Sequence, residues 1–287
     1  MKQRLEELFL IDILYAYLDS VRVHVDNTIM YEEADTRLAE LFSIKPQWNT
    51  FKDVYLYLTG VSTPYLTNTG KMSNGSFGFS AKHCKAGSYL VNIKNSICSK
   101  CYGLVGCYAW DSYKTKSDRT IESINKFFWK EAMVFIIKKK GFKEFRWFDN
   151  GDIQSDKMLE DIFYIARHTP DVKHWLPTKE YRMVKRTIQK GLHKPDNLDI
   201  RLSAFKINGK PPLKLAQQLG VNCSVALTSD EFKKRETKGL VEIKCHTAHS
   251  FRNQFKDNKQ LFNILGACSG CTACYNNKVD VVYYEEH

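Results

Sequence analysis

Four cysteines within thirty residues near the C-terminus constrain this chain more than any other feature. Cys245 is followed by Cys268, Cys271 and Cys274, and the last three are spaced C-x2-C-x2-C. Consecutive C-x2-C steps let one short loop present several sulfurs to the same metal centre. Iron–sulfur clusters are held by Cys thiolates in such loops, and zinc takes Cys in tetrahedral sets of four. We expect these four cysteines to bind a [4Fe-4S] cluster, with zinc as the alternative.

A second group of cysteines lies upstream, where Cys98 and Cys101 form a C-x2-C pair and Cys84 precedes them by fourteen residues. Such pairs occur in zinc knuckles, redox motifs and iron–sulfur clusters alike. These three thiols could hold a cluster with one iron left open, or Cys107 could complete the set. The simpler interpretation is that Cys84 and Cys107 are small buried hydrophobic residues. Cys223, in an apolar segment, is assigned to the core.

The nine cysteines also bear on the redox environment of the protein. An odd number fits a disulfide framework poorly, and clustered thiols in a reducing compartment indicate metal binding more often than disulfides. No apolar run approaches the roughly 18 residues that span a bilayer. The acidic, amphipathic N-terminus does not resemble a secretory signal. We therefore expect a cytoplasmic protein without a membrane partner.

The chain carries a formal net charge of +11 at neutral pH, which is compatible with a polyanionic partner such as nucleic acid. Its lysines are scattered over short runs, among them Lys138 to Lys140 and Lys233 to Arg235. A solvated lysine-rich surface explains the same composition without any partner. Nucleic acid therefore stays open as a partner, although no DNA- or RNA-binding motif stands out.

Helices are predicted for the N-terminal part of the chain. Apolar residues recur at helical spacing between residues 4 and 24. A second helix is expected from Tyr31 to Phe42 and a third from about Pro46 to Leu58, since proline is tolerated near a helix start. We interpret residues 1–60 as a helical extension and residues 61–287 as the domain that carries the cysteines.

After a turn-rich stretch from Gly60 to Gly78, predicted strands and helices alternate. Ser88 to Ile93 is predicted as a short strand, and residues 117–140 as one long helix. Alternation with short connections is typical of parallel βα units. Five or six such units predict an α/β fold, a complete or partial TIM-like βα barrel, with a doubly wound open sheet as the alternative. Further strands are expected at residues 142–148, 172–176, 198–205, 221–227, 241–244 and 279–284, and helices at 158–168, 181–190 and 213–219.

In either fold, functional side chains gather at the C-terminal ends of the parallel strands. Asp149 and Asp152 follow one predicted strand, and such a pair can bind hydroxyl groups, hold a cation or act as acid and base. Turn formation and helix capping explain the same residues equally well. Lys179 and Glu180 follow the next strand, and Arg201 lies on or near the end of another. If the protein is an enzyme, we expect these five side chains to contact the substrate at the barrel mouth.

Together these motifs resemble the bacteriophage gene-product-88 family, which takes its name from a phage open reading frame. The resemblance covers residues 71–275, most of the chain beyond the N-terminal helices. It implies a phage-encoded protein in the host cytoplasm. The segments that carry it are Cys84, Ile97–Gly103, Arg146–Ser155, His174–Glu180, Arg201–Ala204 and the four C-terminal cysteines.

More loosely, three cysteines early in a βα pattern resemble those of the radical S-adenosylmethionine (SAM) enzymes. Those enzymes hold a [4Fe-4S] cluster by three thiolates and leave one iron free for SAM, and some carry a second, C-terminal cluster. The resemblance assigns cofactor binding to Cys84, Cys98 and Cys101, with SAM as a further cofactor. The C-x3-C-x2-C run of that family is absent, and no Gly-Gly-Glu-like segment is evident. It therefore implies a cluster-bearing barrel more strongly than radical chemistry.

Two hypotheses of function follow from these observations. The first is a phage-encoded iron–sulfur protein with a TIM-like barrel, one or two [4Fe-4S] clusters and a redox or SAM-dependent reaction on an unknown substrate. The second is a protein whose fold is stabilised by zinc or by a structural cluster. Such a protein would bind nucleic acid or a host protein through its basic surface. The colour of the purified protein separates them, because iron–sulfur clusters are brown and zinc is colourless.

Overall fold

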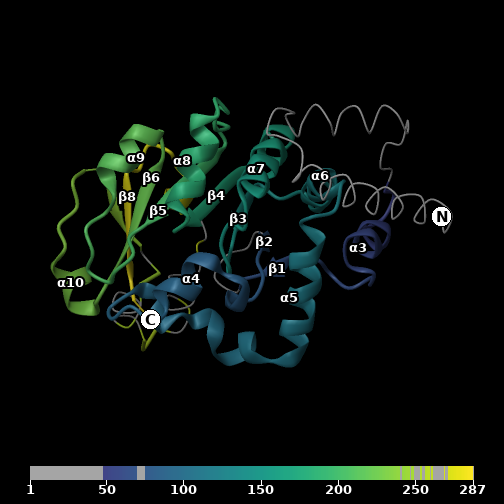
Figure 1. The fold of residues 1–287 in the computed structure, drawn as a ribbon. Helices are drawn as coiled ribbons and strands as arrows, with labels where there is room; N and C mark the ends of the chain where they lie inside the picture. The colour runs from purple at the N-terminus through teal and green to yellow at the C-terminus, as the bar shows by residue number, and fades with distance from the viewer. Residues whose placement is uncertain are drawn as a thin grey trace.

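The fold is described from a computed structural model of the chain (Figure 1). The structure describes residues 48–69, 75–239, 241–245, 247–248, 253, 256–258, 260, 268 and 271–286. The helices predicted at residues 4–24 and 31–42 lie outside the described residues.

Strands and helices alternate along the described chain, with the cysteine loop inserted after the second strand. The strands are β1 (Thr67–Asn68), β2 (Gly75–Phe77), β3 (Glu144–Trp147), β4 (Lys173–Thr178), β5 (Leu198–Ser203), β6 (Asn222–Leu227), β7 (Glu242–Lys244) and β8 (Val281–Glu285). The α-helices are α3 (Phe51–Thr59), α4 (Lys85–Leu90), α5 (Asp111–Ser123), α6 (Trp129–Lys140), α7 (Asp156–His168), α8 (Tyr181–Gln189), α9 (Leu213–Leu219) and α10 (Ser229–Lys234). Short 3-10 turns are η1 (Ala81–His83), η2 (Ile97–Lys100), η3 (Tyr102–Leu104), η4 (Gly106–Ala109) and η6 (Ala273–Tyr275).

One open sheet contains all eight strands, in the order β1-β2-β3-β4-β5-β6-β8-β7. β1 pairs antiparallel with β2, and the other pairings are parallel. From β2 to β6 the spatial order follows the chain order, so right-handed crossovers place their helices on the same face. A doubly wound sheet instead reverses its order at a switch point and carries helices on both faces. The predicted TIM-like fold is therefore confirmed in its partial form, since the edge strands β1 and β7 do not pair with each other within the described residues.

The two faces of the sheet differ in chemistry. Side chains alternate between the faces along each strand, and the registers place Arg146, Trp175, Arg201, Ser224 and Tyr284 on one face. The opposite face carries the apolar side chains that pack with α6 to α10 into one core. The face without these helices is the inner, polar face of the partial barrel. The C-terminal cysteine loop packs onto it, through contacts of η6 with β4 and β5.

Helix α3 has a well-defined start and end. The Thr50 hydroxyl accepts the Asp53 N–H at 3.2 Å while the Asp53 carboxylate accepts the Thr50 N–H at 2.9 Å, which is a capping box. Gly60 ends the helix in the left-handed conformation, at φ 71°. The sequence predicts that this helix starts near Pro46. The capping box instead starts it at Phe51.

Helix α3 also packs on the barrel. Val54, Tyr57 and Leu58 belong to the same buried core as the helices and strands of the βα units. The predicted division between residues 1–60 and 61–287 stays a prediction. Among the described residues, no helix combines the length and the apolar character needed to cross a membrane.

The strand predicted at Ser88–Ile93 is wrong, because this segment belongs to helix α4 and the turn that follows it. The Cys84 sulfur caps the helix by accepting the Gly87 N–H at 3.2 Å. Because the cap is a sulfur and not a Ser, Thr, Asp or Asn oxygen, the usual helix start signal is missing.

The single helix predicted at residues 117–140 is also wrong. The structure has two helices, α5 and α6, separated by residues 124–128. Phe127 and Phe128 are both buried, and the Phe128 N–H donates to the Tyr57 hydroxyl at 3.1 Å. This contact with α3 holds the break between the two helices, so tertiary packing overrides the helical pattern.

The other predicted strands and helices within the described residues are confirmed, with shifts of a few residues at their ends. The sequence pattern does not predict β1, β2 or α10. β2 has only three residues, Gly75 to Phe77, within a segment interpreted as turns. A strand this short shows no alternation by which it could be recognised.

Candidate metal centres

The upstream cysteines lie over the C-terminal ends of β3 and β4. The chain between β2 and α5 passes through η1, α4 and η2 and carries Cys84, Cys98 and Cys101. Cys84 is within electrostatic reach of Cys98 and of Asp152, which follows β3. Lys179, which follows β4, acts on both Cys84 and Cys98. The structure therefore brings this loop together with two of the predicted mouth residues.

Burial sets the acidity of these thiols. It raises the pKa of Cys84 to about 12, the charges of Asp152 and Cys98 add to the shift, and the Gly87 N–H and Lys179 oppose it. Burial also raises the pKa of Cys98, against the opposing charge of Lys179. These two thiols stay protonated at neutral pH unless a metal cation replaces the protons, because the thiolate is the form that binds metal.

Asp152, which follows β3, accepts hydrogen bonds from residues at the end of β4. Its Oδ1 accepts the Thr178 hydroxyl at 2.6 Å and the Ile153 N–H at 2.8 Å, and its Oδ2 accepts the Lys179 N–H at 2.8 Å. The residue is buried, and burial raises its carboxyl pKa despite these hydrogen bonds. Asp152 therefore fixes the backbone of Lys179 beside the upstream cysteines.

Asp149 is buried on the β1 side of the same mouth. Its carboxylate accepts the Thr67 hydroxyl at 2.7 Å, and its backbone carbonyl accepts the Tyr102 hydroxyl. Phe148 precedes it with φ of 56°, a left-handed conformation that is costly for a residue other than glycine. Because Tyr102 directly follows Cys101, its hydrogen bond positions the last upstream cysteine against the end of β3.

Glu180 completes the group at the mouth. Burial raises its pKa, Asp152 adds to the shift, and a hydrogen bond from the Ala86 N–H opposes it. Its own N–H donates to the Thr178 hydroxyl at 3.0 Å. Four of the five predicted mouth residues, all except Arg201, therefore surround the upstream cysteine loop.

Arg201 lies in the middle of β5 and is completely buried. Its Nη2 lies 2.5 Å from the carboxylate of Asp199 on the same face of the strand. Its guanidinium also donates to five backbone carbonyls at distances from 2.9 to 3.4 Å. The acceptors are Ala273, Cys274, Asn276 and Val279 in the C-terminal loop, and Cys223 in β6. Arg201 thus shapes the downstream cysteine loop, and its role toward a substrate stays a prediction.

Cys245 and Cys268 both lie within electrostatic reach of Cys274. Burial raises the pKa of Cys274 to about 12, the Tyr284 hydroxyl opposes this shift, and Cys245 and Cys268 add to it. The Cys245 sulfur lies 3.2 Å from the hydroxyl of Thr247. The fourth, Cys271, donates its N–H to the carbonyl of Cys268 at 3.2 Å. His246 and His249 could serve as alternative imidazole ligands from their position in the sequence next to Cys245, and both lie outside the described residues.

Three buried hydrogen-bond donors near this loop have no partner among the described residues. They are Trp175 Nε1, Arg146 Nε and the Tyr275 hydroxyl. The Arg146 guanidinium lies 4.7 Å from the centroid of the Trp175 ring, and Trp175 and Tyr275 pack with Cys268 and Cys274. An unsatisfied buried donor costs about 1–3 kcal/mol. Acceptors of a group held by the cysteines would satisfy such donors.

The thiols of this loop could bind metal, and the unpaired N–H and O–H groups beside them would suit the sulfur acceptors of the predicted cluster. The described residues contain no group of three or more His, Cys, Asp or Glu side chains that could hold a single metal ion. In a zinc site all sulfurs lie about 2.3 Å from one ion. In a [4Fe-4S] site each thiolate binds a different iron, so the sulfurs stand farther apart. The predicted cofactors stay predictions.

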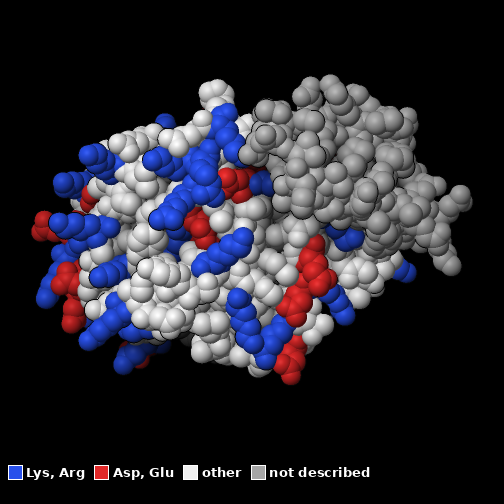
Figure 2. All heavy atoms as spheres, in the orientation of Figure 1, with Lys and Arg blue, Asp and Glu red and all other residues white. Residues whose placement is uncertain are grey.

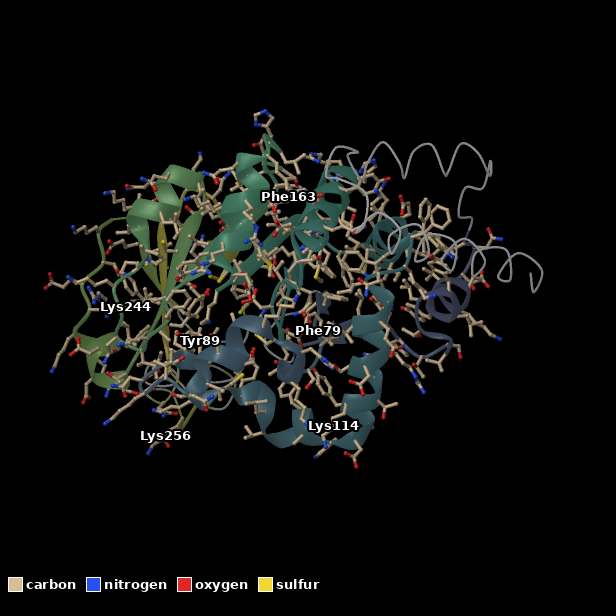
Figure 3. All side chains as sticks on the ribbon, viewed as in Figure 1. Phe79, Tyr89, Lys114, Phe163, Lys244 and Lys256 are labelled. Atoms are coloured by element: carbon tan, nitrogen blue, oxygen red, sulfur yellow. The ribbon has the colours of Figure 1, made fainter. Side chains whose placement is uncertain are left out.

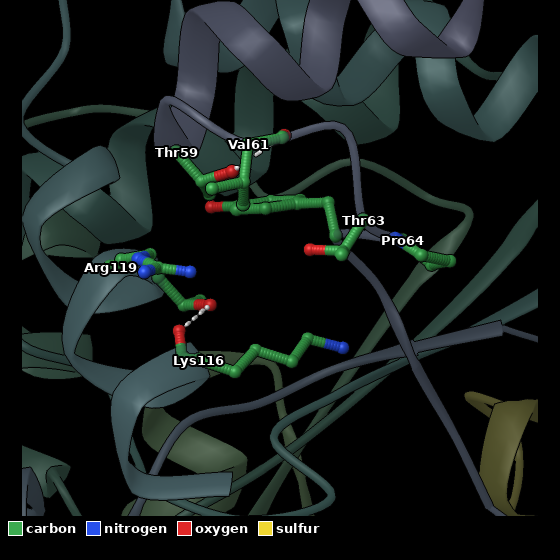
Figure 4. Close-up of a pocket in the computed structure, with 8 residues that line it drawn as sticks. Thr59, Val61, Thr63, Pro64, Lys116 and Arg119 are labelled. Atoms are coloured by element: carbon green, nitrogen blue, oxygen red, sulfur yellow. Dashed lines mark hydrogen bonds between the residues drawn. The ribbon is translucent and has the colours of Figure 1, made fainter. Parts of the chain in front are cut away.

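Two pockets of the described structure lie away from both cysteine loops. Figure 4 shows one between Val61 and Thr63 on one side and Lys116 and Arg119 of α5 on the other. Its volume of about 10 Å³ is room for roughly one water molecule. A second, of about 160 Å³, lies where α6 leads into β3 and α7 into β4, at the N-terminal end of the strands. Neither is the mouth at which the predicted site residues meet.

Sequence reasoning misses four residues of the downstream site: Arg146, Trp175, Tyr275 and Tyr284. Three of them lie within β3, β4 and β8, whereas most of the site residues predicted from the sequence follow a strand. The detectable signal is Arg146, because a charged side chain inside the run Phe145-Arg146-Trp147 indicates that one face of the strand is not apolar. The sequence does not show that this face meets the C-terminal loop.

The fold and its cysteines define an open TIM-like βα protein with one cysteine loop after its first parallel strand and another on its inner face. Residues 48–277 match the family described as gene product 88, and the chain belongs to this family. The match starts well before residue 71 and includes α3. Neither a curated protein nor a solved structure gives a significant match.

Proposed function

We propose that this protein is a phage-encoded iron–sulfur protein whose C-terminal loop binds a [4Fe-4S] cluster on the inner face of the partial barrel. The proposed ligands are Cys245, Cys268, Cys271 and Cys274. Arg201 acts as a positioning residue, because it holds the loop by four backbone carbonyls and leaves the thiols free to bind.

The unpaired donors are the observation that carries this proposal. Arg146, Trp175 and Tyr275 each offer a buried donor without a partner among the described residues. Polar groups left unpaired in a dry environment are costly. The sulfides and thiolates of a cluster accept hydrogen bonds, and such bonds tune the reduction potential. A zinc ion on the same thiolates would bring no sulfide acceptors.

The upstream loop is proposed as a second site with an open position. Cys84, Cys98 and Cys101 supply three thiolates next to Asp152 and Lys179. When bound there, a three-thiolate cluster supplies an open iron that can take a substrate or SAM, as in the radical SAM enzymes that the loop loosely resembles. The residues of the chain orient this site, because Asp152 holds the backbone of Lys179, and the Lys179 charge favours the thiolate of Cys98.

Metal and acid-labile sulfide analysis of anaerobically purified protein tests the proposal. One cluster corresponds to about four irons and four sulfides per chain, and two clusters to about eight of each. One or two zinc ions with no sulfide would overturn the proposal and place the protein in the structural-metal class.

Three cysteine variants assign the irons to the two sites. Cys271→Ala should remove the iron of the C-terminal site, and Cys98→Ala the iron of the upstream site. Cys223→Ala is the matched control, because this cysteine is fully buried on the helix-covered face of β6. Full iron retention and unchanged melting of Cys271→Ala would count decisively against the C-terminal site.

Calorimetric titration with SAM tests the finer assignment of the upstream site. Binding should be lost in Cys98→Ala and kept in Cys271→Ala. Absence of binding to wild-type protein that contains both clusters would remove SAM from the proposal and leave the iron–sulfur assignment standing.

A further inference from the structure

Two segments without carboxylates meet beside the mouth of the partial barrel. Residues 54–110 contain five lysines and no Asp or Glu, and residues 200–229 contain three lysines and one arginine and no Asp or Glu. The two segments pair with each other, because the Ile97 N–H donates to the Phe205 carbonyl at 3.1 Å and the Ile207 N–H donates to the Asn95 carbonyl at 3.0 Å. Lys94 and Lys206 are both exposed and flank this pairing.

The same two segments expose most of the large hydrophobic side chains of the described chain. Of the seven that are exposed, six lie in these segments. Tyr89, which Figure 3 labels on α4, is 74% exposed, and Trp110 is 66% exposed. Phe205 is 41% exposed and stacks on Tyr181 with ring centroids 4.5 Å apart. Exposed apolar side chains mark an interaction surface where they form one patch, and the pairing of the two segments brings Phe205 next to Ile97.

The surface charge favours an anionic partner. Figure 2 shows Lys and Arg side chains spread over the face that carries α4, α8 and α9. Several carboxylates approach the two segments from other elements, among them Asp118, which lies 2.9 Å from His83. Glu286 pairs with Lys100 at 3.0 Å, and half-buried Glu180 contacts the Ala86 N–H of α4. Lys100 is therefore already paired, whereas Lys94 and Lys206 lie in segments that contain no carboxylate of their own.

We propose that this surface, defined by Tyr89, Phe205, Lys94 and Lys206, binds single-stranded nucleic acid. Aromatic rings offer stacking platforms to unpaired bases, and lysines neutralise phosphates. An acidic protein could also use exposed rings at an interface, and competition by polyglutamate distinguishes that partner. Duplex recognition uses a helix or a two-stranded ribbon in the major groove, and α4 has only six residues. This binding activity goes beyond the proposed iron–sulfur function and does not depend on it.

Fluorescence anisotropy with labelled 20-nucleotide single strands of DNA and of RNA, and with a 20-base-pair duplex, measures the binding. The sample is the full chain as purified, with its metal content determined. One of the single strands should bind at least tenfold more tightly than the duplex, and the tighter of the two identifies the natural class of strand. Polyglutamate of matched charge should compete poorly.

Two double variants locate the binding site. Tyr89→Ala with Phe205→Ala should weaken single-strand binding at least tenfold through loss of base stacking. Lys94→Ala with Lys206→Ala should reduce the slope of log affinity against log salt by about 1.4, or about 0.7 for each phosphate contact. Lys138→Ala with Lys173→Ala is the matched control, because these lysines are exposed at the opposite end of the strands. The control should bind like the wild type.

Three results would overturn the proposal. The first is duplex binding as tight as single-strand binding. The second is full competition by polyglutamate, which would indicate an acidic protein as the partner. The third is an unchanged affinity of the Tyr89→Ala, Phe205→Ala variant that keeps a wild-type circular dichroism spectrum. Any of these with a metal-loaded sample would leave the iron–sulfur function intact. Conversely, single-strand binding by protein without iron would support the nucleic-acid-binding surface but not the iron–sulfur function.

Discussion

The hydroxyl oxygen of Tyr284 lies 3.0 Å from the sulfur of Cys274 on the inner face of the partial barrel. Burial raises the pKa of Tyr284 well above its usual value, and the charge of Cys274 adds to the shift. Tyr284 therefore keeps its proton when Cys274 is a thiolate, so the phenol is the donor of this hydrogen bond.

Tyr284→Phe should remove this donor and little else. The free energy of unfolding, measured by urea denaturation, should fall by about 1 kcal/mol. In iron-loaded protein, a potentiometric titration should show a lower reduction potential, because a hydrogen bond to a ligand sulfur stabilises the more negative, reduced state. Tyr283→Phe is the control, since this neighbour packs on the helix-covered face. An equal effect of the two variants on the potential would contradict a specific role for Tyr284.

Arg201→Met should destabilise the protein severely. It would leave Asp199 as an uncompensated buried charge and would deprive five carbonyls of their donor. Breaking a buried pair by removing one partner costs about 3–5 kcal/mol. Chemical denaturation measures the loss, and metal analysis of the folded fraction should show less iron per chain if the loop is displaced.

Arg186→Ala is the matched control for this prediction. Arg186 also contacts a carboxylate, with Nη2 2.7 Å from Asp156, but its side chain is 53% exposed. Exposed ion pairs contribute about 0–1 kcal/mol. A loss of similar size in the two variants would show that burial does not set the importance of Arg201.

The sequence identifies the βα alternation well because each unit is long enough to show its period. Strands such as Leu198–Ser203 and helices such as Asp156–His168 are therefore recognisable. The sequence does not predict the short and irregular elements, since β2 has three residues and α4 is capped by a cysteine sulfur. For the site, the rule that strand ends carry function finds Asp152 and Lys179. It does not find Trp175, whose importance depends on a loop one hundred residues later folding back onto β4.

His174 should make the stability of the protein fall at acidic pH. Trp147 donates to its Nδ1 at 3.3 Å, so the ring proton is on Nε2, which lies 2.8 Å from the Thr169 hydroxyl. Burial lowers its pKa from 6.5 to about 3. Between these values the unfolded chain binds a proton that the folded protein does not, so stability is lost as pH falls, by up to about 1.4 kcal/mol per pH unit.

Denaturation of wild type and His174→Gln between pH 7.5 and pH 4.5 measures this contribution. The difference is needed because buried carboxyl groups act in the opposite direction. Asp199, for example, has a pKa raised to about 6 by burial and favours the folded state as pH falls. The variant should be less sensitive to acid than the wild type. The exposed His168 provides the control through His168→Gln, and parallel curves for wild type and His174→Gln would refute the assignment.

Gly151→Ala should lower the free energy of unfolding by more than the cost of a left-handed backbone conformation alone. Gly151 has φ of 84°, and a β-carbon there would lie 2.5 Å from the buried Phe79 ring. Gly191 provides a matched control, since its φ is 83° and nothing lies within 4 Å of its β-carbon position. The left-handed conformation costs about 1–2 kcal/mol in an alanine, and overpacking adds about 1–3 kcal/mol. Gly191→Ala should therefore lose only the first contribution, and Gly151→Ala both, in urea denaturation. Equal losses would mean that Phe79 can move aside, and that the turn between Asp149 and Asp152 is not held by packing against this ring.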